Sequence, residues 1–568
     1  MSDKHEPTPR EGRQWIWRYR GGALDGLGVG GRAESGPRPR CPTAGLVARV
    51  DALGICASDA KMVVMGQDYP LFFDRDFASE PAVLGHEVSL TVIEVGEAYR
   101  HRFWPGMRLG LQPDVFSDGL RTIFGVNLDG GMAQFVVLDD RVLGTSEDTG
   151  YVFQVEPTLS HAAIALSEPW ACVDVAYRPS QRLEPSFGGR AWLWFADGIA
   201  ELSATRSLPS NELVTSHAFD ACGHLAPNAK VLSDHAGTPE AAMTALGGGR
   251  FDDVILVGAT SAEQVEAALS ALKPDGLLVL LLEAPLDDGV EVEPNLIHYD
   301  GLSIIGSVGR DLDAPFLAGR YRSELAEGGS MLVLGAAGTM GRMHVFRALE
   351  RRDPPRRILA TNRDPGRLDD FLSSLRPLAE RRGVRLEGWS PERDTSTLAD
   401  ASKSTSDGGG FDDVVVVAPS EPLIADAMTY AAPGGTVNVF AGLRKSARVR
   451  LRLDRVATHA VHLFGTSGSK KLDQLRVLSR VRNGERDPHR IVAAVGGIHA
   501  VHAAVSAVID KRFGGKIVIY PQCEDLDLLS LAELAAERPE LAPLLRGEDD
   551  LALHWTAQAE QWLLESTG

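Results

Sequence analysis

Cysteine, positive charge and long apolar runs are all scarce in this chain of 568 residues. The five cysteines show no paired spacing, which predicts no disulfide framework and favours a reducing, cytoplasmic compartment. Lysine and arginine total 58 against 77 acidic residues, and the net charge of −19 argues against nucleic acids and anionic membranes as partners. The most apolar run, Gly276–Leu282, is far too short to span a bilayer and instead predicts a buried parallel strand. The polar stretch Met1–Arg20 has no apolar core of the kind a signal peptide needs.

What the chain does have is a set of metal-binding side chains close together in the sequence. Cys56 lies in Gly-Ile-Cys-Ala-Ser-Asp, and His86 and Glu87 follow thirty residues later in Gly-His-Glu. One thiolate, one imidazole and one carboxylate suit a catalytic zinc with an open coordination position. Ser58, two residues beyond the thiolate, offers a proton route away from the metal. Taken singly, the cysteine would be a buried small side chain and the histidine a hydrogen-bonded core residue.

Two segments in the middle of the chain repeat each other at an offset of about 160 residues. Phe251–Gly258 matches Phe411–Ala418, and each is followed by a helical pattern and a Pro-Asp-Gly or Pro-Gly-Gly turn. A second apolar strand then follows, at Leu277–Leu282 in one repeat and Thr436–Phe440 in the other. Strands alternating with helices predict right-handed βαβ units in a parallel sheet. We therefore expect two tandem Rossmann-like domains that arose by duplication.

Only the second repeat carries a nucleotide-binding signature. The short apolar strand Ser330–Leu334 is followed by the glycine-rich turn Gly335–Gly341 and then by a helical pattern. Such a turn brings the backbone close to a pyrophosphate and directs a helix N-terminus at it. In the first repeat Phe195 stands in place of Gly335, and Glu201 in place of Gly341. This substitution pattern predicts that the first repeat is degenerate and binds no cofactor.

The strand after the glycine-rich turn bears on the choice between NAD and NADP. An acidic residue about twenty positions past the glycines would bind the ribose hydroxyls of NAD, but Asn362 takes that place here. The next residue, Arg363, is able to pair with a 2′-phosphate. NADP is therefore favoured over NAD. Asp364 keeps NAD as the alternative, and a solvated Arg363 without a ligand is the third interpretation.

Taken together, the motifs resemble those of the zinc-dependent medium-chain alcohol and polyol dehydrogenases, and they occur in the same order. The further motifs that carry the resemblance are Pro105-Gly106, Gly130-Gly131-Met132-Ala133-Gln134-Phe135, Ser167-Glu168-Pro169 and Gly514-Gly515-Lys516-Ile517-Val518. The resemblance covers roughly residues 40–180 and 326–520, and within the family it is nearest the sorbose-1-phosphate reductase branch. It implies a GroES-like β-rich catalytic domain with a Rossmann domain, and together with the repeat it predicts an α/β fold with two tandem Rossmann-like doubly wound domains, of which the first has no counterpart in the ordinary enzyme.

The resemblance and the repeat together predict the domain limits. The expected domains are the N-terminal part of the catalytic domain (1–185), the degenerate Rossmann-like domain (186–325), the NAD(P)-binding Rossmann domain (326–475), the return segment of the catalytic domain (476–522) and an acidic helical tail (523–568). In the tail, Leu551, Trp555, Ala559 and Trp562 fall at helical spacing, which predicts an amphipathic helix over these residues.

Site residues follow from the resemblance, position by position. Cys56, His86 and Glu168 would be zinc ligands, and Glu87 would bind the zinc directly or exchange with water. Ser58 would take the proton of the substrate alcohol, and Asp59 would orient His86. The expected catalytic residues are Ser58, Asp59 and Glu87, and the expected cofactor contacts are Gly335, Gly338, Thr339, Met340, Gly341, Asn362, Arg363, Ala418, Gly442, Leu443, Thr466 and Ser467. One catalytic zinc and no structural zinc is expected, because no cluster of four cysteines follows Gly-His-Glu.

The resemblance implies a zinc-dependent oxidoreductase that moves a hydride between NAD(P) and a small secondary alcohol or ketone. A polyol or a sugar phosphate is the first choice of substrate. A threonine- or aminocyclitol-type dehydrogenase and a non-catalytic NAD(P)-binding sensor or scaffold are the alternatives. The protein is expected to form a homo-oligomer, or to be a monomer in which the first repeat serves the second as an internal pseudo-partner.

Overall fold

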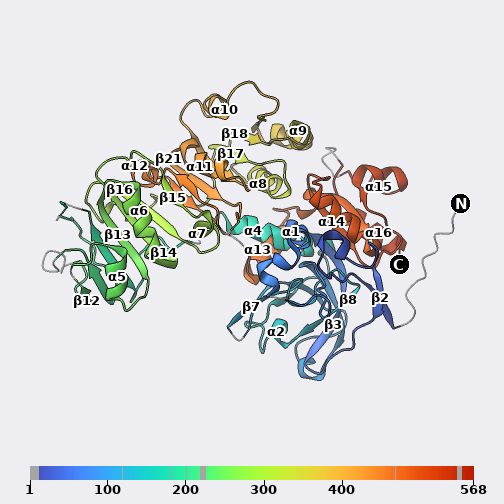
Figure 1. Ribbon diagram of the computed structural model, residues 1–568. Coiled ribbons are helices and arrows are strands. Elements are labelled where there is room, and N and C mark those ends of the chain that lie inside the picture. Colours follow the sequence, from blue (N-terminus) through green and yellow to red (C-terminus); the bar gives the residue numbers. More distant parts are fainter. Residues whose placement is uncertain are drawn as a thin grey trace. The chain divides into compact units, whose positions relative to one another are not determined.

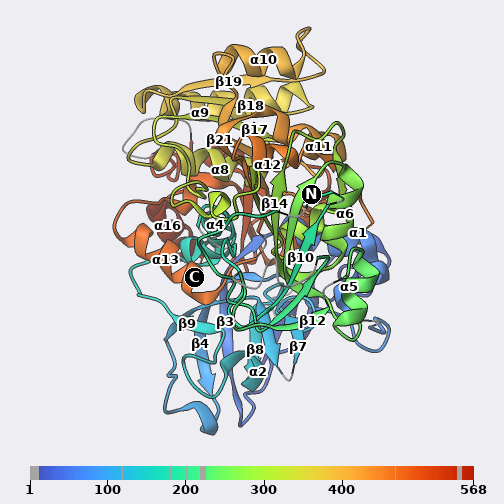
Figure 2. The ribbon, with the colours of Figure 1, turned by 90° about the vertical axis from the view of Figure 1, so that its left-hand side faces the viewer.

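The computed structural model describes residues 12–567 apart from 74, 118, 179–180, 197, 200, 218–224, 234, 445, 467 and 547–552. The chain divides into two compact units. Unit 1 combines Met1–Asp174 with Gly468–Gly568, and unit 2 is the continuous segment Val175–Ser467. Both are mixed α/β structures (Figures 1 and 2).

Unit 1 is organised around an eight-stranded sheet that joins the two ends of the chain. Its order is β26-β24-β25-β3-β4-β5-β9, with β8 pairing on β3. The strands of the unit are β1 (Arg13–Ile16), β2 (Glu34–Pro37), β3 (Gly45–Ile55), β4 (Glu87–Val95), β5 (Arg108–Leu111), β6 (Asp114–Ser117), β7 (Leu120–Ile123), β8 (Phe135–Asp139), β9 (Val152–Gln154), β24 (Val492–Gly497), β25 (Lys516–Tyr520) and β26 (Leu529–Ser530). The return strand β25 pairs antiparallel with β3, so Ile517 lies opposite Ile55. The blue and red ribbons that meet in this unit in Figure 1 are these distant segments.

Short helices connect and cover the strands of unit 1. The α-helices are α1 (Ala57–Met65), α2 (Asp140–Leu143), α3 (His161–Ala165), α4 (Ser167–Val175), α13 (Lys471–Arg482), α14 (Val501–Ile509), α15 (Leu531–Glu537) and α16 (Ala557–Thr567). The 3-10 helices are η1 (Ala23–Gly26), η2 (Gly66–Asp68), η3 (Pro70–Phe72), η4 (Glu97–Tyr99), η7 (Pro488–Ile491) and η8 (Ile498–Ala500). Their apolar side chains and those of β3 and β4 form one continuous core.

The C-terminal tail is helical only in part. We expected a helix from Leu551, but Leu551 lies outside the described residues and α16 begins only at Ala557. Trp555 precedes the helix and is fully buried, and its indole N–H donates to Tyr520 Oη at 2.8 Å. Glu560 of α16 accepts hydrogen bonds from the backbone N–H groups of His161 and Ala162, at 2.5 and 2.7 Å. The tail therefore packs on its own unit and caps α3.

Unit 2 contains two six-stranded sheets in which every neighbouring pair is parallel. The first has the order β12-β11-β10-β13-β14-β16 and the second the order β19-β18-β17-β20-β21-β23. The strands are β10 (Arg190–Phe195), β11 (Glu212–Thr215), β12 (Lys230–Ser233), β13 (Phe251–Ala259), β14 (Leu272–Leu282), β15 (Val290–Val292), β16 (Ser303–Val308), β17 (Ser330–Leu334), β18 (Arg357–Thr361), β19 (Arg385–Trp389), β20 (Phe411–Val416), β21 (Ala431–Val439), β22 (Val449–Leu451) and β23 (His462–Phe464). The helices are α5 (Pro239–Ala245), α6 (Ala262–Ser270), α7 (Pro294–His298), η6 (Ala314–Phe316), α8 (Thr339–Glu350), α9 (Pro365–Arg381), α10 (Leu398–Thr405), α11 (Glu421–Tyr430) and α12 (Asp454–Thr458).

The two sheets have the same strand order, element for element. We call β10–β16 the first copy and β17–β23 the second copy. In both, the first strand is central and the chain then winds outward to either side, which is the doubly wound Rossmann order. The central strands β13 and β20 are apolar because both faces of a parallel sheet are covered. The predicted duplication is therefore visible in the fold, and the green and the yellow-orange ribbons of Figure 1 are the two copies.

The predicted fold class is confirmed: a β-rich unit is combined with two tandem parallel-sheet domains. Among the described residues, no helix is both long enough and apolar enough to cross a lipid bilayer.

Candidate active site

Cys56 lies at the junction between β3 and α1, where the chain turns from strand to helix. The residue is the N-cap of α1, and its backbone N–H donates to Asp59 Oδ2 at 2.9 Å. Gly54 is required just before it, since a Cβ at that position would lie 2.2 Å from Glu87 Oε2. The strand end, the capping aspartate and the glycine together hold the thiol against the start of β4.

The structure brings Cys56, His86 and Glu87 together, with one ligand atom from each residue lying within 4.8 Å of the others. His86 Nδ1 lies 3.4 Å from Asp59 Oδ1, and His86 Nε2 lies 3.4 Å from Ser58 Oγ. Glu87 is fully buried, yet its Oε2 has no hydrogen-bond partner among the described residues. A buried carboxylate oxygen without a donor, next to a thiol and an imidazole, fits a zinc ion.

Lys516 is a member of this site that the sequence did not assign to it. Its Nζ forms an ion pair with Glu87 Oε1 across β4 and β25, and only 3% of its side chain is exposed. Burial alone disfavours the ammonium, but Glu87 and Cys56 outweigh it and raise the pKa of Lys516, which therefore stays charged. Lys516 thus occupies one oxygen of Glu87 and leaves the other for a metal ion.

Glu168, the third predicted protein ligand, lies outside the group of three whose atoms fall within 4.8 Å. Its Oε1 accepts from Cys172 Sγ at 3.3 Å and from Ser469 Oγ at 3.4 Å. Burial raises the pKa of Glu168, and the nearby Glu87 raises it further, whereas His86 lowers it. Burial and Glu168 raise the pKa of Cys172 well above its ordinary value, so this cysteine is a neutral thiol. Glu168 is close enough to the site to feel its charges, but in this arrangement it is engaged by Cys172 and Ser469.

The glycine-rich turn of the second copy has the close backbone packing that a nucleotide requires. Gly335 has φ +93°, and a Cβ there would lie 2.8 Å from the backbone nitrogen of Ala418. A Cβ at Gly341 would lie 2.6 Å from the carbonyl oxygen of Gly335. Gly338, in contrast, is the N-cap of α8, and a Cβ there would meet no atom closer than 3.8 Å. The turn is therefore tight on its protein side and open at the start of the helix, which is where a phosphate binds.

Thr339 and Met340 are the first two residues of α8, immediately after this opening. Asn362 and Arg363 follow the next strand, β18. The Asn362 side-chain amide donates to the carbonyl oxygen of Asp364 at 3.0 Å. The Asp364 carboxylate caps α9 by accepting from the Arg367 backbone N–H at 3.1 Å. Arg363 is exposed, and its guanidinium makes no hydrogen bond or ion pair with the described residues.

The predicted nicotinamide contacts lie beyond the ends of β20, β21 and β23. Ala418 follows β20 and packs on Gly335, and Gly442 and Leu443 belong to the segment 440–443 after β21, which we call the cofactor loop. Thr466 follows β23, whereas Ser467 lies outside the described residues. Because β20, β21 and β23 are parallel neighbours, the segments that follow them lie at one edge of the sheet.

In the first copy, apolar side chains fill the position of the nucleotide turn. Phe195 is buried, and a Cβ at Gly258, the residue that corresponds to Ala418, would lie 2.6 Å from Ile199 Cγ1. Ile199 and Phe195 belong to one apolar cluster. The described residues between β10 and β11 form no α-helix, so nothing there corresponds to α8. The first copy therefore has neither the space nor the helix N-terminus that a pyrophosphate needs.

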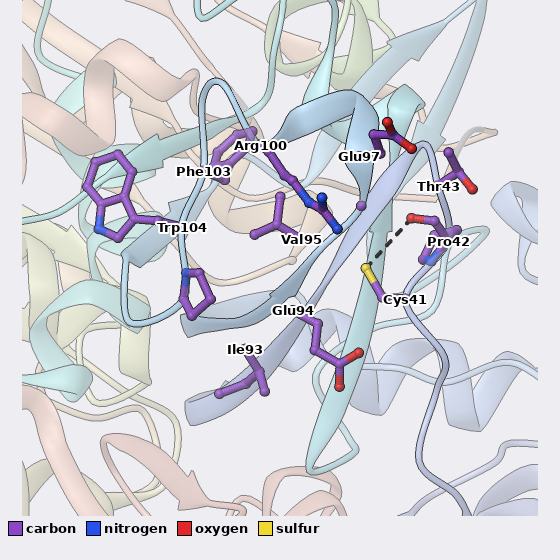
Figure 3. Close-up of a pocket in the computed structure, with 12 residues that line it drawn as sticks. Cys41, Pro42, Thr43, Ile93, Glu94, Val95, Glu97, Arg100, Phe103 and Trp104 are labelled. Atoms are coloured by element: carbon purple, nitrogen blue, oxygen red, sulfur yellow. Dashed lines mark hydrogen bonds between the residues drawn. The ribbon is translucent and has the colours of Figure 1, made fainter.

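A surface pocket of about 740 Å³ is present in unit 1, but its lining does not include Cys56, His86 or Glu87 (Figure 3). It is lined by residues before β3, at the end of β4 and in the segment after β4, among them Cys41, Glu94, Arg100 and Trp104, and by none of the predicted site residues. Cys41 Sγ contacts the carbonyl oxygen of Pro42 at 3.6 Å, and burial raises the pKa of its thiol.

Comparison with known proteins points to the same group of enzymes as the sequence motifs, the alcohol and polyol dehydrogenases. Residues 43–147 match the family model described as "Alcohol dehydrogenase GroES-like domain". The chain is 31% identical over 258 residues to mannitol-1-phosphate 5-dehydrogenase of Aliivibrio fischeri, a match that covers 43% of this chain and 59% of that protein. It is 27% identical over 238 residues to L-sorbose 1-phosphate reductase of Klebsiella pneumoniae, covering 42% of this chain and 55% of that protein. The chain thus spans somewhat more than half the length of these curated relatives.

Among solved structures, 2R,3R-butanediol dehydrogenase from Bacillus subtilis has the same fold, with a TM-score of 0.50 and 16% sequence identity. That match covers 89% of this chain and 99% of the other. The GroES-like domain, the curated relatives and the shared fold agree with the motifs in the sequence. Residues 43–147 therefore belong to the alcohol dehydrogenase GroES-like domain family, and the chain as a whole has the fold of a butanediol dehydrogenase and is similar to the alcohol and polyol dehydrogenases.

Proposed function

We propose that this protein is a zinc-dependent oxidoreductase that transfers a hydride between NAD(P) and a secondary alcohol or ketone. The observation that carries the proposal is the group of Cys56, His86 and Glu87, whose ligand atoms lie within 4.8 Å of one another beside Ser58. The absence of paired cysteine spacing supports a cytoplasmic location.

Cys56 and His86 would hold the zinc, together with the free oxygen of Glu87 or with Glu168. When bound, zinc supplies Lewis-acid polarisation of the substrate oxygen. Asp59 orients the His86 ring through Nδ1 and leaves Nε2 for the metal side. Ser58 Oγ would accept the proton of the substrate hydroxyl and pass its own proton on toward solvent, and its position 3.4 Å from His86 Nε2 supports this role.

We assign cofactor binding to the second copy, because only its glycine-rich turn has open space at a helix N-terminus. The nicotinamide supplies the hydride acceptor or donor. NADP is favoured over NAD, because Asp364 is committed to capping α9 while Arg363 extends into solvent without a partner among the described residues. A 2′-phosphate would give Arg363 that partner.

A polyol phosphate or ketose phosphate is the proposed substrate class. The two curated relatives named above are by name a dehydrogenase of mannitol 1-phosphate and a reductase of L-sorbose 1-phosphate. Each of these two matches extends over less than half of this chain.

Zinc content and turnover test the proposal directly. We expect about one zinc per chain and NADPH-linked turnover on hexitol or ketose 1-phosphates, measured against free polyols, threonine and aminocyclitols. Cys56→Ser should lose both the zinc and the activity, whereas the matched control Cys41→Ser, outside the site, should keep both. Turnover restricted to threonine or an aminocyclitol would redirect the substrate assignment. Bound zinc and cofactor without any turnover would instead indicate a sensor or scaffold.

A further inference from the structure

The two copies pack against each other around an approximate two-fold axis. Strands β15 and β22 form a separate antiparallel pair in which Glu291 lies opposite Arg450, Val290 opposite Leu451 and Val292 opposite Val449. Each residue of β15 corresponds to the residue of β22 that lies 159 positions later in the chain. Glu291 therefore faces its own counterpart, Arg450. Val290 faces the counterpart of Val292, and Val292 faces the counterpart of Val290. This reciprocal register is the signature of an isologous interface between two related halves. A single apolar core runs through both halves.

Across this interface, helix α7 of the first copy contacts the cofactor loop of the second copy. Asn295 Nδ2 donates to the carbonyl oxygen of Leu443 at 3.1 Å, and Asn295 Oδ1 accepts from the Leu443 backbone N–H at 3.3 Å. Asn295 is buried, so both backbone groups of Leu443 are paired by a single side chain away from solvent. Leu443 is thereby joined to the first copy by two hydrogen bonds, the number that a residue exchanges with its hydrogen-bonded partner in an antiparallel sheet.

The two residues at the end of α7 extend this contact. His298 Nδ1 lies 3.1 Å from the carbonyl oxygen of Val439, the last residue of β21. Burial lowers the pKa of His298 to about 4, so the neutral ring donates its Nδ1–H to that carbonyl at physiological pH. Tyr299 is 53% exposed, and its hydroxyl lies where a Cβ on Gly442 would come within 2.3 Å. The first copy therefore borders the cofactor loop along its backbone.

The reverse contact, from the second copy to the first, is different. Residue 454 is the counterpart of Asn295, but it is an aspartate whose carboxylate pairs with Arg452 at 2.8 Å. Arg452 in turn donates to the carbonyl oxygen of Leu286, in the segment after β14 of the first copy, at 3.3 Å. Both segments are thus contacted from across the interface. Among the described residues, however, only Leu443 has its backbone N–H and carbonyl both paired there by one buried side chain, and Leu443 belongs to the copy with the open nucleotide turn.

We propose that the first copy is a positioning element for the cofactor site of its neighbour, with Asn295 holding the loop that borders the nicotinamide. The inference rests on the proposed assignment of cofactor binding to the second copy. Asn295 acts through the Leu443 backbone and touches no reacting atom, so it is a positioning residue. Holding the loop in advance spares the cofactor the cost of ordering it on binding.

The test compares NADPH affinity in wild-type protein, Asn295→Ala and a matched control, Glu291→Ala. Glu291 is exposed at the centre of the same interface, and neither its strand partner Arg450 nor Glu266, to which its backbone N–H donates, belongs to the cofactor loop, so its loss should leave affinity unchanged. We expect Asn295→Ala to raise the NADPH dissociation constant about tenfold at unchanged zinc content, with faster amide exchange at residues 440–443. Unchanged affinity and exchange in a folded Asn295→Ala protein would overturn the inference.

Hydrogen exchange in the wild-type protein tests the inference even if Asn295→Ala fails to fold. NADPH should slow exchange both at residues 440–443 and at α7, and should leave α5 of the first copy unchanged. Protection of the loop without protection of α7 would overturn the inference. A wild-type protein that binds neither NADPH nor NADH would refute the proposed function instead, so the two failures are distinguishable.

Discussion

Replacing Lys516 by methionine should destabilise the metal-free protein much more than the zinc-loaded protein. Lys516 and Glu87 are both buried, and the ammonium is the cation that compensates one oxygen of this carboxylate. Removing one partner of a buried ion pair costs about 3–5 kcal/mol, because the other charge is left uncompensated. Methionine keeps most of the side-chain volume, so the loss would come from the charge and not from a cavity.

Zinc changes the size of this effect, since a dication beside Glu87 replaces the missing positive charge. If about 2 kcal/mol of the penalty is recovered in this way, the variant must bind zinc about 30-fold more tightly than wild type. The free energies of unfolding with and without zinc, and a competition titration for the zinc dissociation constant, measure both sides of this cycle. Amide hydrogen exchange at β4 and β25 then reports the stability of unit 1 alone.

Lys61→Met is the matched control, because Lys61 is an exposed lysine on α1 of the same unit. It should change neither stability nor zinc affinity by more than about 0.5 kcal/mol. Equal destabilisation of Lys516→Met with and without zinc, or a variant as stable as the control, would show that Lys516 does not compensate Glu87.

Three further outcomes follow from the structure of unit 2. Gly335→Ala should weaken NADPH binding at least tenfold in a titration, whereas Gly408→Ala, also at positive φ but in open space, should leave binding unchanged. The pKa of His298, about 4, lies below its ordinary value, so the stability that the neutral ring contributes above pH 6.5 is lost as the pH falls towards 4. Between pH 7 and pH 5 the free energy of unfolding should therefore fall by about 2 kcal/mol more in wild type than in His298→Gln, as measured by denaturation. Oxidation should link Glu291→Cys/Arg450→Cys within one chain on a gel, and a two-chain band from Arg450→Cys alone would reveal instead a symmetric dimer built through β22.

Local patterns in the sequence were sufficient to predict much of the fold. Ser330–Leu334 was predicted as a strand and forms β17 with those bounds, because a parallel strand covered on both faces must be apolar throughout. The glycine-rich turn was predictable for a similar reason, since Gly335 needs a positive φ that other residues rarely adopt. Both features depend on residues close together in the chain.

Contacts between distant residues were not predictable in the same way. Lys516 and Glu87 are 429 positions apart, and only the pairing of β25 with β3, next to β4, brings them together. The tail helix begins later than the periodicity predicts, because Trp555 fits the helical spacing but lies before the helix, where its indole packs on Tyr520. Periodicity gives the face of an element but not the partner that covers it.

The repeated Phe-Asp-Asp motif shows what the duplication has kept in the first copy. Asp253 of the first copy and Asp413 of the second each form an ion pair with an arginine that precedes the first strand of the same copy, Arg182 or Arg322. Each carboxylate also accepts from a backbone N–H two residues beyond a glutamate, at Ser186 or Ala326. Both copies have thus retained the clamp that ties the entering chain to the sheet.

The nucleotide turn, unlike this clamp, has not been kept in the first copy. If the first copy were free of constraint, its ion pair and its turn would be expected to degrade alike. Instead the pair between Arg182 and Asp253 remains, while Phe195 has closed the turn. The contacts that survive are those that tie the entering chain to the sheet of the first copy. This is the pattern expected of a domain retained for what it holds in place, and the bond from Asn295 to Leu443 is the contact through which it would act.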